Sequence, residues 1–189
     1  DRAACRAAKG TGADALGLVS SMPGGPGIIQ ESLSREIAAA VPPPIGTFLL
    51  TSSQDVNDII RQQRYCGTNT IQICDQLKQG THKELSEALP GIKIVQVLHV
   101  TGPEAIEQAR LIDSQVDAIL LDSGNPRAAV KELGGTGRVH NWEISRTICK
   151  QAECPVFLAG GIGFHNVKEA LDVVRPYGLD LCSSVRTGD

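Results

Sequence analysis

Short hydrophobic runs alternate with longer amphipathic segments along the whole chain. Each run is nearly continuous in its hydrophobicity and rich in β-branched residues, which is typical of strands buried on both faces of a parallel sheet. The pattern predicts seven strands, over residues 13–19, 47–51, 70–74, 92–100, 118–122, 156–160 and 179–183.

The segments between these runs carry helix patterns. Apolar residues recur every three or four positions, as on the buried face of a helix. Serine and asparagine can cap the first free N–H groups of a helix, and proline suits its first turn. We therefore expect helices to begin near Ser32, Ser53, Pro103, Asn141 and Asn166, and a further helix over residues 1–10.

Strands that alternate with helices imply parallel β-α-β crossovers, in either an open doubly wound sheet or a closed (β/α)8 barrel. The order begins with a helix and ends with a strand, which gives seven strands and seven helices. In a closed barrel the missing strand and helix would be neighbours, so one absent sector explains the deficit. We predict an α/β fold, a single incomplete TIM-barrel domain over residues 1–189 without its first strand and last helix. The open sheet is the alternative, because it needs no missing part.

Composition narrows the function to small-molecule chemistry. A net charge of −3 and an aromatic content of 3% argue against a nucleic-acid-binding face. No apolar stretch is long enough to span a membrane. The six cysteines are scattered, without metal-ligand spacing. We therefore expect reduced thiols, no metal site, a cytoplasmic location, and a monomer or homodimer that binds a small molecule.

Candidate functional residues stand where the predicted strands end. Barrel enzymes place catalytic groups at the carboxyl ends of their strands and bind phosphate after the seventh and eighth. Glycine lets backbone N–H groups approach a phosphate closely, and serine adds a hydroxyl donor. The candidates at these ends are Asp122 for catalysis and Gly160, Gly161, Asp180, Ser183 and Ser184 for binding substrate or phosphate.

A glycine-rich loop follows the strand that ends at Asp122. It contains Gly134, Gly135, Thr136 and Gly137. This loop does not run straight from a strand into a helix, so we interpret it as a lid rather than a phosphate cradle. His99, His140 and His165 show no partner pattern, and we expect ordinary packing or surface roles for them.

These motifs resemble the phosphoribosylanthranilate isomerase family. The run Leu120-Leu121-Asp122-Ser123, followed by the Gly-Gly-Thr-Gly loop and Trp142, is similar to a strand and loop of that family. Residues 158–162 with Asn166-Val167 resemble its phosphate-binding strand and helix. Residues 12–17 and 173–180 match in order, so the resemblance covers essentially the whole chain.

The resemblance implies an Amadori rearrangement in tryptophan biosynthesis, converting an N-(5'-phosphoribosyl) amine into a 1-amino-1-deoxyribulose 5-phosphate. An acid opens the ribose ring to a Schiff base, and a base then removes the C2 proton. No cofactor is needed, because the proton moves within one substrate. The family's acid matches Asp122, and apolar surroundings would raise its pKa so that it keeps its proton. The family's base is a cysteine on the first strand, which is absent from the predicted strand order; Cys5 is expected in the helix that would follow that strand.

Three further positions depart from the family pattern. Cys74 stands where the family has a histidine, and Ser184 stands where it has a glycine. The loop over residues 20–27 lacks the arginine that family members use near the anthranilate carboxylate. A second interpretation therefore stays open: a non-catalytic or functionally diverged phosphosugar-binding barrel.

Overall fold

The computed structural model describes residues 10, 12–24, 27–126, 128, 131–134, 137 and 139–185. The helix predicted over residues 1–10 lies outside this part of the chain, except for Gly10. The chain divides into two compact units. The N-terminal unit comprises Asp1–Met22 and Gly27–Ile94, and the C-terminal unit comprises Pro23–Pro26 and Val95–Asp189.

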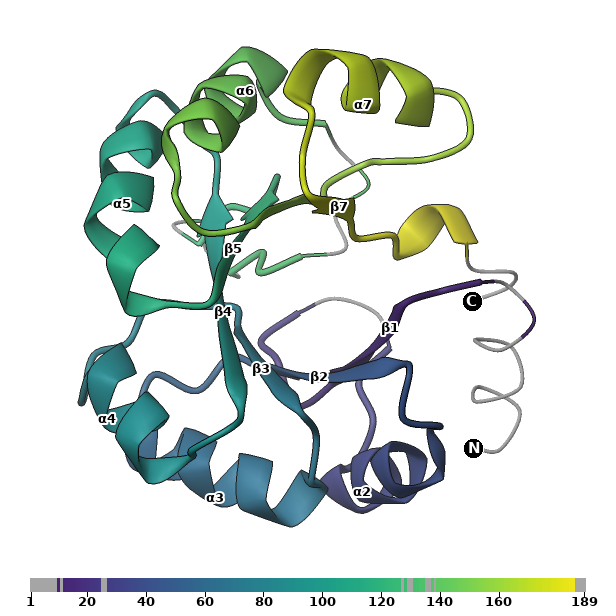
Figure 1. Ribbon diagram of the computed structural model, residues 1–189, viewed down its shortest axis with the longest axis vertical. Helices are drawn as coiled ribbons and strands as arrows, with labels where there is room; N and C mark the ends of the chain where they lie inside the picture. The colour runs from purple at the N-terminus through teal and green to yellow at the C-terminus, as the bar shows by residue number, and fades with distance from the viewer. Residues whose placement is uncertain are drawn as a thin grey trace. The chain divides into compact units, whose positions relative to one another are not determined.

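The N-terminal unit pairs three parallel strands in chain order. In their register, Ala15 lies opposite Gly46 and Phe48 opposite Thr70. Three helices lie along one side of these strands (Figure 1). The elements are β1 (Ala15–Val19), α2 (Glu31–Ala40), β2 (Gly46–Thr51), α3 (Val56–Cys66), β3 (Thr70–Ile73) and α4 (His82–Ala88).

The C-terminal unit repeats the arrangement with four parallel strands paired in chain order, again with helices along one side (Figure 1). Strand β4 begins with the last two residues of the N-terminal unit. The elements are β4 (Lys93–His99), α5 (Glu104–Ile112), the 3-10 turn η1 (Asp113–Gln115), β5 (Ala118–Asp122), α6 (Trp142–Gln151), β6 (Val156–Leu158), α7 (Val167–Val174), β7 (Gly178–Leu179) and the 3-10 turn η2 (Ser183–Val185).

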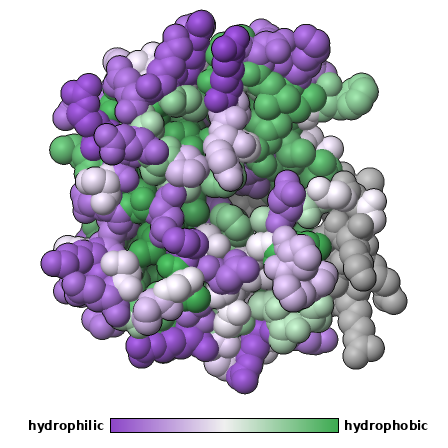
Figure 2. Space-filling model, in the orientation of Figure 1, coloured by the Kyte–Doolittle hydropathy of each residue, from purple (hydrophilic) through white to green (hydrophobic). Residues whose placement is uncertain are grey.

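The hydrophobic core of the C-terminal unit lies between its strands and helices. All five residues of β5 are buried, as the continuous apolar run predicts. Leu121 and Leu158 pack with Ile148 of α6 and Val174 of α7. The outer surfaces of the helices carry mainly hydrophilic side chains (Figure 2). Within the described part of the chain, no helix has both the length and the apolar character that a membrane span requires.

The helix beginnings follow the predictions with small shifts. Asn141 caps α6 as expected, because its side chain accepts the N–H of Glu143 at 3.0 Å. Asp55 rather than Ser53 caps α3, since its carboxylate accepts the N–H of Asn57 at 2.8 Å. Asn166 precedes α7 but caps no helix N–H group. Its side chain accepts the N–H of Gly163 at 2.8 Å and so stabilises the preceding loop.

The last strand is shorter than predicted. Strand β7 comprises only Gly178 and Leu179, which pair with Phe157 and Leu158 of the three-residue strand β6. The N–H of Asp180 still donates to the carbonyl of Leu158 at 2.9 Å. Because the described pairing stops there, Asp180 lies at the carboxyl end of the strand instead of inside it.

Candidate active site

Asp122 ends β5 as a buried carboxyl group. The residue is 5% exposed. Loss of hydration raises the pKa of Asp122, and the N–H groups of Ser123 and Gly124 and the charge of His99 oppose this rise without cancelling it. A carboxyl group that keeps its proton above the usual range of aspartate can act as a general acid.

His99 lies beside this carboxyl group. It ends β4 and is the register partner of Asp122 on the neighbouring strand. Its Nδ1 atom is 4.0 Å from Oδ2 of Asp122, and both side chains are almost fully buried. The sequence pattern predicts only a packing or surface role for His99. The signal that could have found it is positional, because both residues end adjacent parallel strands.

Asp180 is the second acidic group of the region. Surrounding protein and the negative charge of Asp122 raise the pKa of Asp180 to about 6. The two carboxyl groups are therefore close enough to influence each other's ionisation. The Asp180 residue is nevertheless exposed to solvent. Water therefore screens part of the repulsion between the two carboxyl groups.

The glycine pair after β6 packs against the end of β5. Gly160 and Gly161 have φ angles of 81° and 64°, a conformation that favours glycine. A Cβ atom on Gly160 would lie 2.7 Å from Oγ and 2.9 Å from the backbone nitrogen of Ser123. The absence of a side chain at Gly160 is therefore a condition for the contact between these two strand ends.

Ser183 and Ser184 belong to the exposed turn η2. Ser184 approaches the loop after β6, since a Cβ atom on Gly163 would lie 3.1 Å from the Ser184 Cβ. Asn166 braces this loop by donating from Nδ2 to the Gly161 carbonyl at 3.0 Å. The structure thus brings the serine turn to the same loop that begins with the glycine pair.

The described ends of the expected lid loop reach the same region. A Cβ atom on Gly134 would lie 3.4 Å from Oδ2 of Asp122, and one on Gly137 would lie 3.8 Å from Oγ of Ser183. Gly135 and Thr136 lie outside the described residues. The loop therefore approaches both the candidate acid and the serine turn.

The other histidines of the C-terminal unit keep ordinary environments. Burial lowers the pKa of His140 to about 4, and its Nε2 atom lies 2.7 Å from Oγ of Ser145. His165 is exposed. Across the residues that the structure describes, no three His, Cys, Asp or Glu side chains gather in a group that could hold a metal ion.

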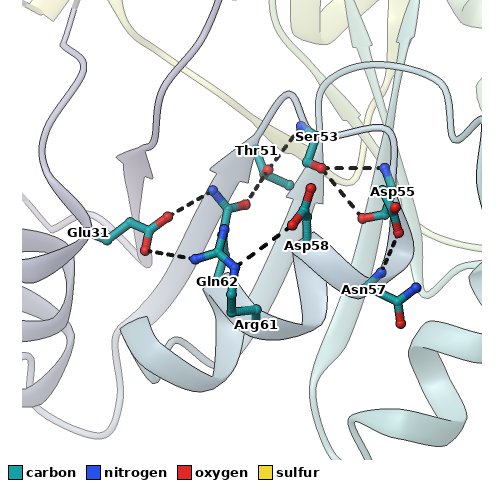
Figure 3. Close-up of polar contacts among 8 residues, drawn as sticks. All are labelled: Glu31, Thr51, Ser53, Asp55, Asn57, Asp58, Arg61 and Gln62. Carbon is teal, nitrogen blue, oxygen red and sulfur yellow. Dashed lines mark hydrogen bonds and ion pairs between the residues drawn. The ribbon is translucent and has the colours of Figure 1, made fainter.

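A separate polar cluster in the N-terminal unit has a structural explanation (Figure 3). Thr51, at the end of β2, donates to Oε1 of Gln62 at 2.7 Å. Gln62 donates from Nε2 to Glu31 at 3.0 Å, and Arg61 lies 3.6 Å from the same carboxylate. These contacts connect β2, α3 and the first residue of α2, so the polar groups satisfy one another.

Ionisable groups at the carboxyl ends of parallel strands that alternate with helices are typical of (β/α)8-barrel enzymes. That is the class of protein which the fold and the site define. Residues 10–188 match the family described as N-(5'phosphoribosyl)anthranilate (PRA) isomerase. The chain therefore belongs to the phosphoribosylanthranilate isomerase family.

Individual relatives agree with this assignment. The chain is 36% identical over 176 residues to N-(5'-phosphoribosyl)anthranilate isomerase 2 of Methanosarcina mazei, covering 93% of this chain and 77% of the relative. The crystal structure of phosphoribosyl anthranilate isomerase from Thermus thermophilus is 26% identical, with a TM-score of 0.76 over 99% of this chain and 84% of that one.

A third comparison adds a ligand-bound relative. A phosphoribosyl anthranilate isomerase in complex with reduced 1-(o-carboxyphenylamino)-1-deoxyribulose 5-phosphate is 22% identical, with a TM-score of 0.76 over all of this chain and 85% of that one. These likenesses confirm the predicted TIM-barrel class of fold, in preference to the open doubly wound sheet.

The close contact between Gly160 and Ser123 generates a stability prediction. Gly160→Ala adds a methyl group where Ser123 leaves no room and where φ is positive, so unfolding free energy should fall by about 2–4 kcal/mol. Gly67→Ala is the matched control, because Gly67 has a φ of 69° with open space around its Cβ position. It should cost only about 1 kcal/mol. Urea unfolding measures both, and equal costs would contradict the close contact.

Proposed function

We propose that this protein isomerises N-(5'-phosphoribosyl)anthranilate by an Amadori rearrangement, as a step of tryptophan biosynthesis. Family membership and the 36% identical relative support this reaction. The observation that carries the chemistry is the buried carboxyl group of Asp122, whose pKa is raised, at the carboxyl end of β5. An acid that keeps its proton is what the first step of the reaction requires.

In the first step Asp122 donates its proton to the ribose ring oxygen. The bond between that oxygen and C1 breaks, and the lone pair of the substrate nitrogen forms the C=N bond of a protonated Schiff base. Asp122 is left as a carboxylate that accepts the N–H groups of Ser123 and Gly124. These two donors limit the cost of placing the new negative charge in a buried position.

In the second step a base removes the proton from C2. The electrons of that C–H bond form the C1=C2 bond of the enolamine, and the C=N electrons return to the substrate nitrogen. The enol hydroxyl then loses its proton while C1 gains one, which produces the ketose. The family's base is a cysteine on the strand that precedes the helix expected over residues 1–10. It therefore corresponds to none of the 189 residues, and we assign this step to no residue of the chain.

Substrate binding is assigned to the surrounding strand ends. Gly160 and Gly161, with Ser183 and Ser184, would bind the phosphate through backbone N–H groups and hydroxyls. Asp180 would accept hydrogen bonds from the ribose hydroxyls, because it lies near Asp122. Residues 134–137 would form the lid, since Gly134 lies against the carboxyl group of Asp122.

The cellular location, domain organisation and oligomeric state of the enzyme are also proposals. We expect a cytoplasmic enzyme, in keeping with the biosynthetic family to which the chain belongs. A single domain, and a monomeric or homodimeric state, stay predictions from the sequence.

A phosphosugar-binding barrel without catalysis is the second candidate function. The observation that favours it is Cys74, which stands at the end of β3 in place of the family's histidine and is only 2% exposed. A buried thiol is a much weaker hydrogen-bonding group for a ligand than an imidazole is. The activity of the complete protein distinguishes the two functions.

Replacing the candidate acid tests the first function. Asp122→Asn keeps the shape of the side chain but removes the proton that it delivers. In the complete protein, kcat should fall about 10²–10⁴-fold while phosphosugar binding persists. The wild-type rate should decline on the alkaline side, because the reaction needs protonated Asp122. Loss of phosphoribosylanthranilate fluorescence measures the rate.

Asp172→Asn is the matched control, since Asp172 is exposed on α7 and pairs with Lys168 at 2.9 Å. Its rate should equal that of the wild type. Equal rates for Asp122→Asn and the wild type would remove Asp122 from the mechanism. An inactive complete protein that still binds phosphosugar would support the binding-protein function instead.

The phosphate site can be tested with inorganic phosphate. Gly161→Ala places a methyl group at a φ of 64° and disturbs the backbone that would approach the anion. The Kd for phosphate should rise roughly tenfold or more, about 1.4 kcal/mol. Amide chemical shifts should change at Gly160, Gly161, Ser183 and Ser184 in the wild type. Gly67→Ala should leave the Kd unchanged, and shifts confined to residues 134–137 would move the site to the loop.

A further inference from the structure

We propose that His99 is a positioning residue for Asp122: it holds the carboxyl group in place and stabilises the carboxylate that remains after proton transfer. This proposal rests on the proposed function of Asp122 as the general acid. It assigns a role to a side chain that the sequence motifs leave unused.

The geometry gives His99 and Asp122 a fixed mutual position. They are register partners at the ends of two paired strands, so the backbone sets their separation. Their side chains are 6% and 7% exposed, and neither can turn into water without unpacking its surroundings. The separation of 4.0 Å between Nδ1 and Oδ2 suits an ion pair when the imidazole carries its second proton, and is longer than a direct hydrogen bond.

The loop after β5 closes against the imidazole ring. A Cβ atom on Gly124 would lie 2.5 Å from Nδ1 and 2.9 Å from Cε1 of His99. The same loop turns back on itself, because the N–H of Glu132 donates to the carbonyl of Asn125 at 3.1 Å. Gly124 thus allows the loop to pack onto the ring, and the packing restricts where the imidazole can move.

The charged groups around Asp122 act in opposite directions. Burial favours the protonated acid. The negative charge of Asp122 in turn raises the pKa of Asp180, which lies beyond β7. His99 on β4 and the N–H groups of Ser123 and Gly124 favour the carboxylate. A general acid must hold its proton before the reaction and be stable as a carboxylate after it. Its pKa must therefore be neither too low nor too high. His99 is the side chain that offsets burial.

Two substitutions separate position from charge. His99→Gln keeps an N–H donor but carries no positive charge, and His99→Leu removes both. In either variant the alkaline limb of the kcat profile should move to higher pH, because Asp122 then holds its proton more tightly. The leucine variant should also lose kcat by ~10-fold with little change in KM, and glutamine should restore part of that loss.

His140→Asn is the matched control, because His140 is a half-buried histidine of the same unit but contacts Ser145. It should leave the alkaline limb unchanged. Circular dichroism checks folding, and the glutamine variant, which has a similar volume, carries the test if the leucine variant does not fold. An unchanged limb in His99→Gln would overturn the role of His99 alone. Wild-type kcat in Asp122→Asn would instead overturn the proposed function.

Discussion

Burial of one carboxyl group at the end of β5 is the constraint on which the site depends. An aspartate in water is ionised at neutral pH and has no proton to give. Asp122 is held by the apolar strand Ile119–Leu121, which is itself buried in the core of the C-terminal unit. The same packing that stabilises the fold therefore raises the pKa of Asp122, as its proposed role of general acid requires.

The neighbours of Asp122 are small or polar for reasons that follow from this burial. Gly134 comes near the carboxyl oxygen. Gly160 lies so close to Ser123 that a side chain there would force the two strand ends apart. Ser123 and Gly124 offer N–H groups to the carboxylate, and His99 faces it from β4. Together these N–H groups and His99 lower the free-energy cost of ionising the Asp122 carboxyl group, which burial otherwise favours in its neutral form.

Sequence predicts the parts of this arrangement that are local. Continuous apolar runs located the strands, and the end of the run over 118–122 identified Asp122. The proximity of His99 was missed, because it depends on the register between two strands rather than on a motif. Strand β7 ends early because its partner strand β6 is short. Asp180 therefore lies just beyond β7, where the charge of Asp122 raises its pKa. The length over which two strands pair, and the electrostatic effect of a residue distant in sequence, cannot be predicted from one segment alone.

The protonation state of Asp122 in the complete protein tests this account most directly. Infrared spectroscopy detects the C=O stretch of a protonated carboxylic acid, and the band that disappears in Asp122→Asn but persists in Asp180→Asn belongs to Asp122. Because burial raises the pKa of Asp122, the account predicts that this band disappears at a higher pH than the band of an ordinary aspartate, whose pKa is about 3.9. A band whose midpoint lies at or below that ordinary value would show that burial does not hold the proton, and would contradict the role of Asp122 as the acid.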